Sequence, residues 1–112
     1  MIKKLATIAA LAMLLGSSGS YAGFRSGNNL ANDCKKDDGE FSDGVCYGYV
    51  MGVTDLLLWV NPNVKPCAPS EVTGGQVVAI VRKFLKEHPE MLHEDADFLV
   101  MSALQEAFPC SE

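Results

Sequence analysis

The sequence has 112 residues, of which 48% are hydrophobic and 21% are charged, with a formal net charge of −5 at pH 7. This length is that of one small domain. The acidic balance argues against nucleic acid or an anionic lipid surface as a partner, and it permits a basic protein partner.

The first 22 residues have the layout of a cleavable secretory signal. Lys3 and Lys4 precede an apolar run over residues 5–15, and small residues lead to Ala22. A permanent membrane anchor is the weaker alternative, because crossing a bilayer takes about 20 apolar residues. We therefore expect residues 1–22 to be removed, leaving 23–112 as one exported domain in an oxidising compartment. It would carry seven basic and fourteen acidic side chains, a formal charge of −7.

Two N-cap candidates mark the first helices of this domain. Ser26 is suited to cap a first helix from about residue 28 to 35. After a charged turn, Ser42 or Asp43 is expected to cap a second helix over about residues 44–60, which an Asn-Pro pair ends.

The second helix is apolar on nearly every side, so we expect it to be buried centrally. Gly48 and Gly52 share one face and would let another helix approach closely. Asp55 is the exception in this segment, because a buried carboxylate needs a partner such as a helix N-terminus or Arg25; a structural hydrogen bond is the simpler interpretation. Along this helix the apolar residues Val45, Tyr49, Val53, Leu56, Leu57 and Val60 recur at helical spacing, and Tyr47, Val50, Met51 and Leu58 make the opposite face apolar as well.

A capping box is predicted at Thr73 and Gln76, opening a third helix through about His88. The run VVAIV would also suit a strand, but the cap, the length and the helical spacing favour a helix. The proline after His88 interrupts it, and a fourth helix follows from about residue 90 or 94 to 108. The inner stripes are predicted to be Val77, Ile80, Val81, Phe84 and Leu85, then Leu92, Ala96, Leu99, Val100, Ala103 and Ala107.

The four cysteines are expected to form two disulfides, because an even number in a short exported chain is typical of them. Without a CxxC pair, zinc binding and redox catalysis are disfavoured. We predict an all-α fold of four to five helices in two antiparallel hairpins, the first helix with the second and the third with the fourth. Of three possible connectivities, hairpin ends favour Cys34–Cys46 and Cys67–Cys110.

The titratable residues do not converge on a catalytic site. His88 and His93 are five apart, which is not the i, i+4 spacing of a helical metal site. The acidic residues between Asp37 and Asp43 lack the ligand spacing of a calcium loop, and no serine or threonine has an evident base. We expect no enzyme activity, no metal and no cofactor.

Several segments together carry a family resemblance: CYGYVMGVTD from Cys46, then Cys67 followed by VTGGQ, then FL at 84–85 with HPE at 88–90, then LV at 99–100 and AL at 103–104, and the closing AFPC. In this order the chain resembles the Tai/Rap immunity proteins of bacterial type VI secretion, which neutralise peptidoglycan-cleaving amidase toxins. The resemblance spans residues 24–110. It implies a small helical periplasmic protein, often a homodimer, that binds the toxin and obstructs its active-site cleft.

Two proline-containing connections are candidates for toxin contact, residues 61–65 and 87–94. By analogy with family members whose loop enters the toxin cleft, we predict the second; a solvated helix connection is the alternative. The predicted partner-binding residues are Glu87, His88, Pro89, Glu90, Met91, His93 and Glu94.

Two other functional classes remain open at this point. A small periplasmic acid-stress chaperone is also helical and disulfide-bonded, and it would expose apolar surface as its carboxylates become protonated. The other class is an enzyme or a metal carrier.

Overall fold

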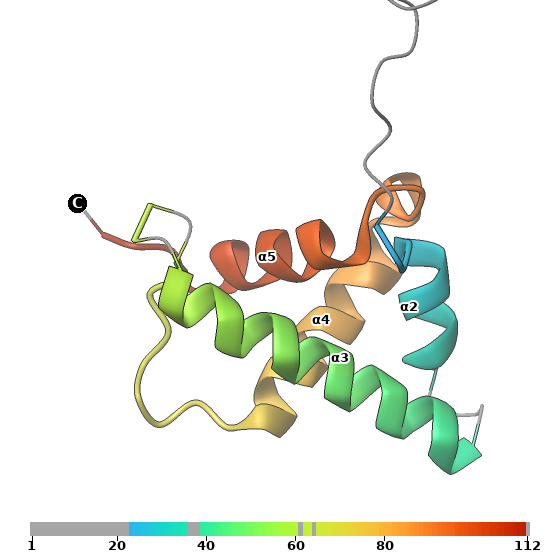
Figure 1. The fold of residues 1–112 in the computed structure, drawn as a ribbon. Coiled ribbons are helices and arrows are strands. Elements are labelled where there is room, and N and C mark those ends of the chain that lie inside the picture. Colours follow the sequence, from blue (N-terminus) through green and yellow to red (C-terminus); the bar gives the residue numbers. More distant parts are fainter. Residues whose placement is uncertain (1–22, 36–38, 61, 64, 112) are drawn as a thin grey trace, which may run out of the picture.

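The computed structural model describes residues 23–35, 39–60, 62–63 and 65–111; the expected signal at 1–22 lies outside them. Within these ranges there is no strand beyond one isolated bridge between Ser26 and Asp95, so the predicted all-α class is confirmed (Figure 1). The elements are α2 (Gly27–Asp33), α3 (Gly39–Val60), α4 (Gly74–Glu87), the short 3-10 helix η1 (Pro89–Met91) and α5 (Ala96–Ala107).

Capping boxes begin α2 and α4. The sequence predicts the box at Thr73, whereas at Ser26 it predicts the cap alone. The Asn29 amide donates to the Ser26 hydroxyl at 3.2 Å, and the Asn29 side chain accepts from the Ser26 amide at 3.1 Å. Thr73 and Gln76 repeat the arrangement at 3.2 and 2.8 Å. Each box satisfies backbone donors that a helix start otherwise leaves unpaired.

The start of α3 differs from the prediction. The helix begins at Gly39, where φ is +88°, a conformation that glycine adopts without strain. Ser42 and Asp43 therefore lie inside the helix and do not cap it. The Asp43 carboxylate instead pairs with Arg82, so it links α3 to α4.

The prediction that α3 is centrally buried is wrong. Of its described side chains only Cys46 and Val50 are fully buried, and Leu56, expected to face inward, is 63% exposed. A Cβ atom on Gly48 or Gly52 would meet nothing within 4 Å, so no helix approaches there. The contacts of α3 with α2, α4 and α5 all fall on its other side. Although α3 has 22 residues, no helix in the described ranges is long and apolar enough to cross a membrane.

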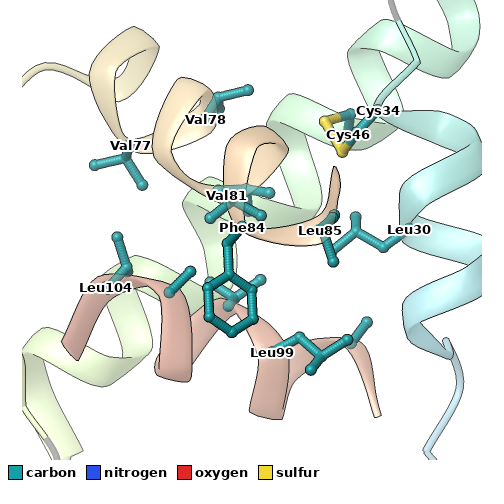
Figure 2. Packing of buried hydrophobic residues seen from close by; sticks show 14 residues of the cluster. Leu30, Cys34, Cys46, Val77, Val78, Val81, Phe84, Leu85, Leu99 and Leu104 are labelled. Atoms are coloured by element: carbon teal, nitrogen blue, oxygen red, sulfur yellow. A yellow bond between two sulfur atoms is a disulfide. The ribbon is translucent and has the colours of Figure 1, made fainter. Parts of the chain in front are cut away.

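The core lies mainly between α4 and α5, with Leu30 of α2 and the Cys34–Cys46 bridge at its edge (Figure 2). Both predicted stripes are largely confirmed, but each is wider than expected, because Val78 and Leu104 are also buried. Ala107 is exposed, contrary to prediction. The buried residues of α4 and α5 are Val77, Val78, Val81, Phe84, Leu85, Ala96, Leu99, Val100, Ala103 and Leu104.

Both predicted disulfides are confirmed. Cys34–Cys46 and Cys67–Cys110 each join Cα atoms 5.0 Å apart. The Cys67 amide also donates to the Phe108 carbonyl at 3.0 Å, which fixes the chain entering α4 against the end of α5. Each of the four described α-helices contacts the other three, so they pack as one unit.

Candidate partner-binding site

The α4–α5 loop, residues 88–95, contains most of the predicted partner-binding residues. The fourth helix was predicted to begin at about residue 90 or 94, but α5 begins only at Ala96. The reason is a set of tertiary hydrogen bonds: the Leu92 and Glu94 carbonyls accept from the amides of Asn28 and Gly27 at 2.8 and 2.7 Å. The Ala96 amide, which would bond to the Leu92 carbonyl in a continued helix, donates to the Arg25 carbonyl instead.

The N-terminal segment 25–28 thus holds the main chain of the loop in place. A further bond runs from the Ala96 amide to the Arg25 carbonyl at 3.0 Å. Gly27 is required at this contact, since a Cβ there would lie 2.8 Å from the Leu92 carbonyl oxygen. Gly27 could not be identified from the sequence, because only the fold brings residue 92 beside it.

Five of the seven predicted residues are exposed, and two are turned inward. The ring of His88 stacks on Phe84 at 4.1 Å between centroids, and its Nδ1 lies 2.8 Å from the Phe84 carbonyl oxygen. Met91 is half-buried and packs against the core. These two side chains anchor the loop. The exposed ones are Glu87, Pro89, Glu90, His93 and Glu94.

The exposed surface of the loop is acidic. Glu87 has only a distant partner, with the Lys83 ammonium 3.9 Å away, and His93 Nε2 lies 3.4 Å from the Glu94 carboxylate. Exposed ion pairs of this kind contribute about 0–1 kcal/mol, so these carboxylates are free to exchange partners. A basic or hydrogen-bond-donating protein surface would complement this end of the molecule.

The pKa of Tyr49 in α3 responds to the negative charges beside the loop. Burial raises the pKa of its hydroxyl, and the charges of Asp97 and Asp95 raise it further, while Arg25 acts in the opposite direction. The Arg25 guanidinium lies 5.9 Å from the centre of the Tyr49 ring and also pairs with Asp33. The Arg25 guanidinium is thus engaged by Tyr49 and Asp33, whereas the loop carboxylates are exposed to solvent.

The alternative connection, residues 61–65, is described only in part. Residues 61 and 64 lie outside the described ranges, while Pro62, Asn63 and Lys65 are exposed. The Lys65 carbonyl oxygen lies 3.8 Å from the sulfur of Cys110, which places this connection near the second disulfide.

Asp55 is exposed, contrary to the expectation of a buried carboxylate. It lies at a cavity of about 310 Å³. The cavity is enclosed by α3, by α5 and by the segment that precedes α4, and its apolar walls include Leu58, Val77 and Phe108. Arg25, its suggested partner, pairs with Asp33. No three His, Cys, Asp or Glu side chains of the described residues gather where they could hold a metal ion.

The comparisons with known proteins identify one family. The model of the Rap1a immunity proteins matches residues 26–110, from the Ser26 cap of α2 to the cysteine of the second disulfide. No curated protein and no solved structure matches the chain. The match covers both disulfides, all four described α-helices and the α4–α5 loop, and the chain therefore belongs to the Rap1a immunity protein family.

Proposed function

We propose that this immunity protein acts in the periplasm, where it binds a peptidoglycan-cleaving amidase toxin delivered by type VI secretion and occludes its active site. Family membership is the observation that carries the proposal, since an immunity protein acts against a secreted toxin. The expected signal at 1–22 supports the location, and so do two disulfides, because such bonds persist in oxidising compartments.

The α4–α5 loop supports a mechanism of simple obstruction. Its main chain is bonded to residues 25–28, and its half-buried side chains pack on α4 and the core. A loop already fixed in the free protein loses little conformational entropy on binding. Placed in the toxin cleft, it would exclude the peptide substrate while its carboxylates contact donor groups there. By the family resemblance we also expect a homodimer, which would present two copies of the loop.

The proposal is tested by pairing the protein with the toxin encoded beside it. Periplasmic co-expression should restore growth of cells that export the toxin, and the purified protein should stop cleavage of isolated peptidoglycan. Growth arrest in the presence of a folded, exported protein would contradict the immunity assignment. If the protein rescues cells from a toxin that does not cleave peptidoglycan amides, only the amidase assignment is contradicted.

The loop assignment is tested by a charge reversal and a matched control. Glu90→Lys changes an exposed carboxylate of the loop, and Glu71→Lys makes the same change ahead of the opposite end of α4. We expect Glu90→Lys to weaken toxin binding at least tenfold, about 1.4 kcal/mol, and Glu71→Lys to leave it unchanged. Equal affinities for both variants would show that another surface binds the toxin. Met91 is a poor probe, because its half-buried side chain supports the fold.

A further inference from the structure

The outward side of α3 is an apolar surface that neither the fold nor the toxin-binding loop explains. Phe41 and Trp59 are 85% and 89% exposed. They are separated by eighteen residues, about five turns of 3.6 residues, so they project in the same direction about 27 Å apart. Leu56, 63% exposed, and Val45 lie beside them. We call this surface the outer face of α3; it comprises Phe41, Gly44, Val45, Gly48, Gly52, Asp55, Leu56 and Trp59.

No close contact among the described residues of one copy requires the glycines of this face. An added Cβ on Gly44, Gly48 or Gly52 would meet no atom within 4 Å, and none of the three has a positive φ. A glycine inside a helix is less favourable than alanine by about 1 kcal/mol. The exposed aromatic residues at the two ends of the face indicate that its partner is a protein. The glycines between them would let the backbone of that partner approach closely.

The order of residues along the outer face suits a second copy of itself. A two-fold interface requires each residue to meet its counterpart in both directions. Phe41 and Trp59 lie equally far before and after Val50, and so do Gly48 and Gly52. We propose that the outer face of α3 packs antiparallel on the same face of a second copy, across a two-fold axis that passes between Gly48 and Gly52.

This pairing places side chains of matching character together. Phe41 of one copy faces Trp59 of the other, and the glycines lie at the crossing point. On one side of the crossing Val45 meets Leu56. The one charged member of the face, Asp55, lies at its edge opposite Gly44, where no side chain crowds it.

The area and the charge of the face both suit a stable dimer. Phe41 and Trp59 alone expose about 350 Å² per copy, given that aromatic side chains bury about 150–250 Å² each. With the residues between them, two copies would bury about 1,200 Å² in total, the lower end of the range for specific interfaces. Chains with an expected charge of −7 repel one another, so a face with a single carboxylate is where two copies can meet.

This inference depends on the proposed function only through its expectation of a homodimer. The test therefore uses the periplasmic protein alone, without toxin, so that its failure leaves the immunity assignment untouched. Sedimentation equilibrium over a range of concentrations measures the dimer dissociation constant. Phe41→Glu and Trp59→Lys should each raise it at least a hundredfold, and Phe24→Glu, a matched change at a fully exposed aromatic outside the face, should not.

The double variant Phe41→Glu with Trp59→Lys tests the antiparallel register. It places a carboxylate opposite an ammonium only in that arrangement, so it should recover at least tenfold of the lost affinity. Far-UV circular dichroism confirms that each variant remains helical. A monomeric wild-type protein, single variants that still dimerise, or a double variant no better than the single ones would overturn the proposal.

Discussion

Helices α3 and α4 are both rich in apolar residues, yet they bury very different shares of them. Five of the 14 residues of α4 are buried, against two of the described side chains in the 22-residue α3. In α4 the apolar residues lie along one side, with charged residues such as Lys83 and Lys86 opposite. In α3 they surround the axis, and neighbours cover only one side. Composition therefore sets how much surface could be buried, and the number of neighbouring elements sets how much is.

The largest expected effect comes from comparing two leucines, one in each region. Leu99 of α5 is fully buried between the helices, and Leu56 of α3 is 63% exposed. Leu99→Ala should lower the free energy of unfolding by about 3 kcal/mol, because it leaves a cavity. Leu56→Ala should lower it by less than about 0.5 kcal/mol.

Urea unfolding at low protein concentration measures both variants as monomers. An equal loss for the two leucines would mean that the outer face of α3 is covered within one copy of the chain. That result would remove the contrast between α3 and the core helices.

Two glycines sharpen the comparison at a smaller scale. Gly27→Ala would place its Cβ against the Leu92 backbone, at 2.8 Å from the carbonyl oxygen, so it should destabilise the protein by about 1–3 kcal/mol. Gly48→Ala meets no neighbour and should stabilise the monomer by up to about 1 kcal/mol. Thermal unfolding of the two variants under the same conditions gives the signs, and a destabilising Gly48→Ala would show an unrecognised contact on α3.

The smallest expected effect concerns Tyr49, on the side of α3 that faces the core helices. Its raised pKa means that the folded protein favours the neutral phenol. This contribution to stability is fully present below the ordinary pKa of 10.0 and is lost as the pH rises through the folded value. The free energy of unfolding should therefore fall above pH 10 less steeply in Tyr49→Phe than in the wild type. Identical slopes would contradict the burial of this hydroxyl.

Local chemistry made some features predictable. The capping boxes at Ser26 and Thr73 depend on residues three apart, so a short window of sequence contains the whole interaction. The disulfide pairing followed from the order of helices and cysteines. The inner side of α4 was readable because its apolar and charged residues separate cleanly.

Tertiary context decided the features that sequence reasoning missed. The late start of α5 results from hydrogen bonds to residues 25–28, which are distant in sequence. Asp55 was expected inside because its neighbours are apolar, but it is exposed at the cavity beside the segment before α4. For the candidate site, the polar residues of the loop could be named, whereas the inward turn of His88 and Met91 depends on packing against Phe84 and the core.

The hydrogen bonds that fix the α4–α5 loop join main-chain atoms. The path of the loop therefore does not depend on which side chains stand at its exposed positions. Exposed positions such as Glu90 and His93 contribute nothing to the bonds from Gly27 and Asn28. Side chains there can change while the backbone path is retained. Under the proposed assignment of this loop to toxin binding, the protein can evolve new specificity with little loss of stability.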